Sequence, residues 1–226
     1  MQSVQAGALG KKVTGVDDMF EVGIDEMRRL RTDELVIGLC GPIGSPLHKV
    51  AREFARLLEQ VYGYECTLIR LSEIIEELRG SVSSPARFER IQKLIENGNE
   101  LRREFGASVL ADMVIGKIAL EREHVKKTTG GARYKSRRRC YIIDSIKNNN
   151  ELEVLRLVYR DMFYFVGVFA PLHVRQTELE TRGMSLSEVY RLIDRDSGEE
   201  IEHGQTVRNT FPRPISLSEP APKRRT

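Results

Sequence analysis

Four apolar segments along the chain have the pattern of buried β-strands. They lie near residues 35–40, 64–70, 140–144 and 163–169, and the first reads ELVIGLC from Glu34. A continuous apolar run, rather than strict alternation, is typical of strands covered on both faces of a parallel sheet.

Helical periodicity separates these strands. After the first strand, apolar residues recur every three or four positions from Leu47 to Val61, and Pro46 suits a first helical turn. Further helices are predicted over 73–78, 86–106, 107–123, 148–160, 173–183 and 185–196, with Ser72 as an N-cap and Gly106 as a helix end. Strands that alternate with helices predict an α/β fold, with a parallel sheet flanked by helices.

The two ends of the chain have a different composition. For residues 1–32 we predict a flexible segment with a short helix over 17–31. Residues 212–226 hold four of the eight prolines, and their composition predicts a disordered basic tail. The fold therefore occupies residues 33–211. Within it we predict a basic loop over 124–139 and a lid-like region over 173–200.

Charge and cysteine content favour no special partner. The net charge of +3 comes from 36 basic and 33 acidic residues, which is nearly balanced. Cys40, Cys66 and Cys140 stand in separate apolar contexts, so we expect buried, reduced thiols and no metal site. No apolar run reaches the roughly 18 residues of a membrane span, and the N-terminus lacks a signal-peptide core. These features predict a cytoplasmic protein with no membrane partner.

The turn after the first strand resembles an altered phosphate-binding loop. In the pattern GxxxxGK[ST], Gly41 takes the first glycine position, and Ile43, Gly44 and Ser45 lie inside the loop. The strand–turn–helix frame favours an anion through loop N–H groups and a positive helix end.

Three defining residues of that loop are replaced. Pro46, Leu47 and His48 stand at the second glycine, lysine and hydroxyl positions. Lys49 stands two places after the lysine position, about 200° further around a helix. With Arg52, it is nevertheless the candidate for the cation that a phosphate-binding loop needs. Three interpretations stay open: a turn without ligand, a weakened nucleotide or phosphate site, and a site of full phosphoryl transfer.

Three further segments carry charged residues in suggestive places. Arg102 and Arg103 come just before a helix break, Asp144 ends a predicted strand, and Arg175 and Arg182 lie in the lid-like region. Together with IGLCGPIGS, these segments resemble the P-loop nucleoside and nucleotide monophosphate kinase superfamily. More closely, roughly residues 33–211 resemble the N-terminal P-loop-like domain of the anti-phage deoxycytidine triphosphate deaminases.

The resemblance implies a three-layer, kinase-like P-loop fold and roles for these residues. Arg102 or Arg103 would bind a monophosphate acceptor, Arg175 and Arg182 would stabilise transferring phosphoryl charge, and Asp144 would lie near Mg²⁺ or the acceptor. The ligand would be ATP or a deoxynucleoside triphosphate with Mg²⁺. Solvated helix faces for the arginines and a strand-end cap for Asp144 stay open as alternatives.

The deaminase chemistry itself is missing from the sequence. It needs a zinc site of the form H-x-E…P-C-x-x-C, and none of the four histidines begins an HxE. We therefore expect no zinc and no catalysis by this chain alone. The resemblance implies as partners a nucleotide, a deaminase domain or protein, a small RNA, and further copies of the chain.

The basic loop offers a separate reading. Its residues Arg137, Arg138 and Arg139 are candidates for nucleic-acid contacts, since phosphate binding needs only Lys and Arg. A solvated loop or a nucleotide lid is the alternative. Three hypotheses result: a regulatory nucleotide-binding module, a nucleotide monophosphate kinase, and an RNA-binding regulatory protein.

Overall fold

A parallel β-sheet forms the centre of the fold. The computed structural model describes residues 33–84, 86–128 and 138–198, and in this part of the chain the sheet has four strands in the order β2-β3-β1-β4. They are β1 (Glu34–Cys40), β2 (Glu65–Arg70), β3 (Arg139–Asp144) and β4 (Phe163–Gly167). All pairings are parallel, which confirms the predicted α/β class.

Helices connect the strands much as the periodicity predicts. They are α2 (Leu47–Tyr62), α3 (Leu71–Arg79), α4 (Arg87–Phe105), α5 (Val109–Thr128), α6 (Asn149–Tyr159), α7 (Leu172–Glu180) and α8 (Leu186–Gly198), with a 3₁₀ turn at Arg160–Met162. The lid-like region corresponds to α7 and α8. The predicted N-terminal helix and the tail lie outside the described residues.

Two local predictions are wrong. Ser72 does not cap α3, because the helix begins one residue earlier, at Leu71, directly from the end of β2. The basic loop begins later than predicted, because α5 continues through residues 124–128. Its remaining residues up to 137 lie outside the described part of the chain.

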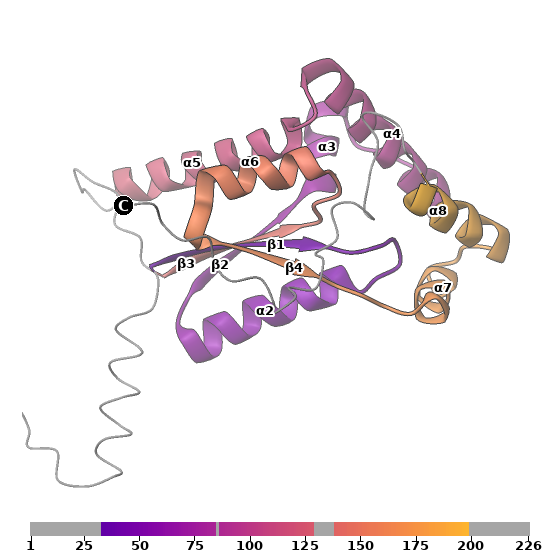
Figure 1. The fold of residues 1–226 in the computed structure, drawn as a ribbon, viewed down its shortest axis with the longest axis horizontal. Coiled ribbons are helices and arrows are strands. Elements are labelled where there is room, and N and C mark those ends of the chain that lie inside the picture. The colour runs from indigo at the N-terminus through magenta and orange to yellow at the C-terminus, as the bar shows by residue number, and fades with distance from the viewer. Residues whose placement is uncertain (1–32, 85, 129–137, 199–226) are drawn as a thin grey trace, which may run out of the picture. The chain divides into compact units, whose positions relative to one another are not determined.

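Helices cover both faces of the sheet. Figure 1 shows α2 on one side and α5 and α6 on the other. On the α2 side, Ile37 and Leu39 pack with Ala51 and Ala55. On the opposite side, Val36 and Ile143 pack with residues of α3, α5 and α6. Consecutive residues of β1 thus enter opposite cores, as alternation along a strand requires.

All three cysteines are free thiols; Cys40 and Cys140 are buried, as predicted, whereas Cys66 is only partly buried. Burial raises the pKa of the Cys40 thiol to about 12. No helix in the described ranges is long and apolar enough to cross a membrane.

Gly38 leaves space beside β1 for the side chains of Ile146, which follows β3, and Phe163, which begins β4. A Cβ atom at this position would lie 2.5 Å from Ile146 Cδ1 and 2.8 Å from Phe163 Cζ. Non-bonded carbon atoms do not approach this closely, so a side chain at residue 38 requires the Ile146 and Phe163 side chains to move.

We therefore expect Gly38→Ala to lower the free energy of unfolding by about 1–3 kcal/mol, the usual cost of overpacking a core. The matched control is Gly116→Ala, because Gly116 is exposed within α5 and a Cβ there meets nothing within 4 Å. The control should raise stability by about 0.5–1 kcal/mol through helix propensity. Urea unfolding of the three proteins measures both, and equal stabilities would contradict the packing at Gly38.

Candidate functional site

The chain leaves β1 and β3 toward opposite faces of the sheet. The segment after β1 leads to α2 on one face, and the segment after β3 leads to α6 on the other. These neighbouring strands are paired, with Leu39 beside Asp144. Such a divergence opens a crevice at the carboxyl ends of the strands, where parallel α/β proteins bind ligands.

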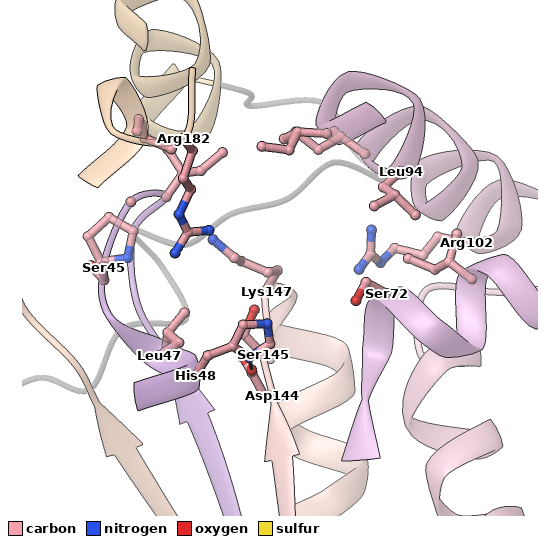
Figure 2. Close-up of a pocket in the computed structure, with 17 residues that line it drawn as sticks. Ser45, Leu47, His48, Ser72, Leu94, Arg102, Asp144, Ser145, Lys147 and Arg182 are labelled. Atoms are coloured by element: carbon pink, nitrogen blue, oxygen red, sulfur yellow. Dashed lines mark ion pairs between the residues drawn. The ribbon is translucent and has the colours of Figure 1, made fainter. Parts of the chain in front are cut away.

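A cavity of about 260 Å³ occupies this crevice. Figure 2 shows Ser45 and the turn after β1 on one wall, Arg102 and Ser72 on the opposite wall, and Asp144 with His48 at the base. The lining residues are Pro42, Ile43, Gly44, Ser45, Leu47, His48, Ser72, Ile75, Ile91, Leu94, Ile95, Arg102, Asp144, Ser145, Lys147, Leu179 and Arg182.

The turn over residues 41–45, called the glycine loop below, is held closely by α7. Gly44 has φ +83°, and a Cβ there would lie 2.8 Å from the Arg175 carbonyl oxygen. Arg175 Nε donates to the Ile43 carbonyl oxygen at 2.7 Å. Burial lowers the pKa of the Arg175 guanidinium, and the charge of Asp196 acts in the opposite direction. Arg175 thus anchors the loop from a site that is nearly closed to water.

Asp196 of α8 also contacts the glycine loop. Its Oδ2 accepts the Ile43 N–H at 2.7 Å, and its Oδ1 forms an ion pair with Lys147 Nζ at 3.0 Å. Lys147 Nζ also donates to the Gly41 carbonyl oxygen at 2.9 Å. One carboxylate therefore links the loop after β1, the loop after β3 and the last described helix.

Arg102 lines the far wall of the cavity while its charge is paired behind that wall. Its Nε donates to Glu151 Oε1 at 2.8 Å, and its Nη1 donates to Asn99 Oδ1 at 3.2 Å. The Arg102 and Glu151 side chains are 2% and 1% exposed, so this is a buried pair. Desolvation raises the pKa of the Glu151 carboxyl, and Arg102 opposes that rise.

Asp144 ends β3 at the base of the cavity. It is buried, and its Oδ2 contacts His48 Nδ1 at the start of α2. His48 stands where a phosphate-binding loop has its hydroxyl, so in this chain an imidazole faces the carboxylate at that position.

Arg182 and Lys49 pair with the same glutamate, Glu178, but only Arg182 lines the cavity. Arg182 lines the cavity and donates to Glu178 Oε1 at 2.7 Å. Lys49 Nζ donates to Glu178 Oε2 at 3.0 Å, is well exposed and is not among the lining residues. These bonds, led by those from Arg182, lower the pKa of Glu178.

The structure brings together most of the predicted phosphate and catalytic residues. Ile43, Gly44, Ser45, Arg102, Asp144 and Arg182 line one cavity. Gly41 begins the glycine loop, and Arg175 contacts that loop. Lys49 points elsewhere, and Arg103 is exposed on α4. Their roles in binding or catalysis stay predictions.

The three arginines predicted as nucleic-acid contacts differ in their surroundings. Arg137 lies outside the described residues. Arg138 Nη1 donates to the Tyr62 carbonyl oxygen at 3.4 Å. Arg139 is 8% exposed and pairs with Glu65 at 2.9 Å and Glu121 at 2.6 Å, so it links the start of β3 to the start of β2 and to α5.

Sequence reasoning missed Lys147 and Asp196 as site residues. Lys147 follows the strand-end Asp144 by three residues, which is a usable signal. Asp196 has none, because it reaches the loop only through the packing of α8.

Comparison with known proteins does not assign the chain to a family. A scan of family models gave no match, and a search of curated proteins gave no similar sequence. Among the described residues no group of His, Cys, Asp and Glu could hold a metal ion. Fold and site define the chain as an α/β protein with a four-stranded parallel sheet and a cavity at its carboxyl edge.

Arg102→Met should lower the free energy of unfolding by about 3–5 kcal/mol, because it leaves the Glu151 carboxyl buried without its cation. Arg103→Met is the matched control: the same change at the next, exposed residue should alter stability by less than about 0.5 kcal/mol. Denaturant unfolding measures both. A small effect at Arg102 would show that the buried pair does not form.

Proposed function

We propose that this chain is a nucleotide-binding, regulatory domain of the kinase-like P-loop type. The observation that carries the proposal is the cavity itself. It lies at the carboxyl ends of β1 and β3, one part of its lining is apolar, and Arg102, Lys147 and Arg182 bring cationic side chains to it. A nucleotide needs this combination: an apolar surface for the base and cations for the phosphates.

The two kinds of lining suggest an orientation for the ligand. Ile75, Ile91, Leu94 and Ile95 come from α3 and α4, with Ser72 and Arg102 beside them. We place the base and sugar there, where a hydroxyl and a guanidinium can supply hydrogen bonds. The phosphates would then face the glycine loop, Lys147 and Arg182.

Binding without turnover fits the loop better than phosphoryl transfer. Leu47 occupies the lysine position and lines the cavity, and the nearby lysine, Lys147, is already paired with Asp196. Phosphoryl transfer depends on positioned positive charge, so these features weaken it. The resemblance to the anti-phage deaminases suggests ATP or a deoxynucleoside triphosphate with Mg²⁺ as ligand and a deaminase as partner.

Kinase activity is the second candidate, since Asp144 and Arg182 both face the cavity. A turnover assay with ATP and nucleoside monophosphates separates the two. Product formation at a rate above that of a Lys147→Gln control would favour the kinase, and its absence beside measurable binding would favour the regulatory domain.

Binding itself is tested by thermal shift with deoxynucleoside mono- and triphosphates, with and without Mg²⁺. A ligand that binds only the folded state raises the melting temperature with its concentration. We expect a shift that depends on the base. Arg182→Gln should weaken the affinity by roughly tenfold to a hundredfold, because it removes a charge-assisted hydrogen bond worth about 1.5–3 kcal/mol.

Lys49→Gln is the matched control, because Lys49 binds the same Glu178 without lining the cavity. Its affinity should equal that of the wild-type protein. An equal loss in both variants would place the effect on Glu178 rather than in the cavity. If no nucleotide shifts the wild-type protein, the proposed function is wrong.

A further inference from the structure

The contacts of Asp196 are those expected of a bound phosphate. In phosphate-binding loops, loop N–H groups and a lysine ammonium donate to the anion. Here the Ile43 N–H and Lys147 Nζ donate to the two oxygens of one carboxylate, at 2.7 and 3.0 Å. Asp196 is 5% exposed, so these contacts are shielded from water.

A second observation concerns a buried donor that is fixed to the same loop. Arg175 is nine-tenths buried, and its Nη2 atom has no hydrogen-bond partner among the described residues. Its Nε atom is fixed to the glycine loop through Ile43. A buried guanidinium N–H without a partner is costly, and an additional anionic oxygen would satisfy it.

The positive charges beside the glycine loop outnumber the negative charge there, which also favours an anion. Lys147 and Arg175 contribute two positive charges near Asp196, which supplies one negative charge. A phosphate carries more negative charge and more acceptor oxygens than a carboxylate, so it can satisfy these donors more completely.

We propose that Asp196 is an internal substitute for phosphate, which a phosphate group of the ligand displaces from the glycine loop. This inference rests on the proposed function and concerns its regulation. Displacement breaks the links from α8 to Ile43 and Lys147. Phosphate binding at the loop is thereby coupled to release of α8, and this coupling would carry the signal out of the site.

The proposal predicts the effect of removing the internal charge. In the wild-type protein, the apparent dissociation constant is the intrinsic one divided by the fraction of molecules with Asp196 displaced. Asp196→Asn keeps the shape and an acceptor oxygen for Ile43 but removes the competing charge. It should lower the apparent dissociation constant for inorganic pyrophosphate by about tenfold or more.

Asp194→Asn is the matched control, because Asp194 lies on the same helix and is exposed. It removes the same formal charge from α8 without a loop contact, so its affinity should equal that of the wild-type protein. Pyrophosphate and, separately, deoxycytidine triphosphate are titrated at constant ionic strength, with the melting temperature or heat of binding as readout.

The outcomes separate this inference from the proposed function. Tighter binding by Asp196→Asn alone supports displacement. Binding by the wild-type protein with equal or weaker binding by Asp196→Asn overturns displacement and leaves the proposed function standing. Absence of binding by all three proteins overturns both.

A measurement on the wild-type protein guards against misfolding of the variant. Amide hydrogen exchange is followed for α8 with and without saturating pyrophosphate. Displacement predicts faster exchange in α8 when pyrophosphate is bound. Slower exchange would mean that α8 closes over the ligand, and it would overturn the proposal.

Discussion

The divergence of the chain after β1 and β3 is the constraint on which the site depends. Because α2 and α6 pack on opposite faces of the sheet, the loops that lead to them separate and leave a crevice between two paired strands. Every other feature of the site fills or lines that crevice. The glycine loop forms one wall, α3 and α4 form the other, and α7 and α8 hold the loop through Arg175 and Asp196.

Each of the three cationic side chains of the cavity has a carboxylate partner, and the partners differ in how firmly they are held. Arg102 and Glu151 are almost fully buried, so neither can leave without stranding the other. Arg182 and Glu178 are partly exposed, so water can replace their contact at little cost. Lys147 and Asp196 lie between these limits. An anionic ligand would therefore compete first for Arg182, then for Lys147, and leave Arg102 paired.

Local patterns in the sequence were sufficient for the strands and for the glycine turn between β1 and α2. The apolar run of β1, the glycine turn and the stripe on α2 are short-range features, so periodicity identifies them. Lys49 does not line the cavity because it stands two residues after the lysine position, about 200° further around a helix, and its side chain pairs with Glu178 instead. Ser72 failed as a cap because α3 starts without a linker after β2, a junction set by tertiary packing.

Asp196 lay beyond sequence reasoning because it is far along the chain from its partners. It is 153 residues from Ile43 and 49 from Lys147, and no local pattern marks an aspartate on an amphipathic helix as a loop ligand.

That contact also bears on the choice between binding and catalysis. Phosphoryl transfer is accelerated by positive charge that already stands where negative charge develops in the transition state. The cation that supplies it therefore has to be available before the reaction begins. A lysine that must first exchange one anion for another is suited to reporting that a phosphate has arrived. The proposed exchange of anions thus gives the loop replacements at Leu47 and His48 and the position of Asp196 one common explanation.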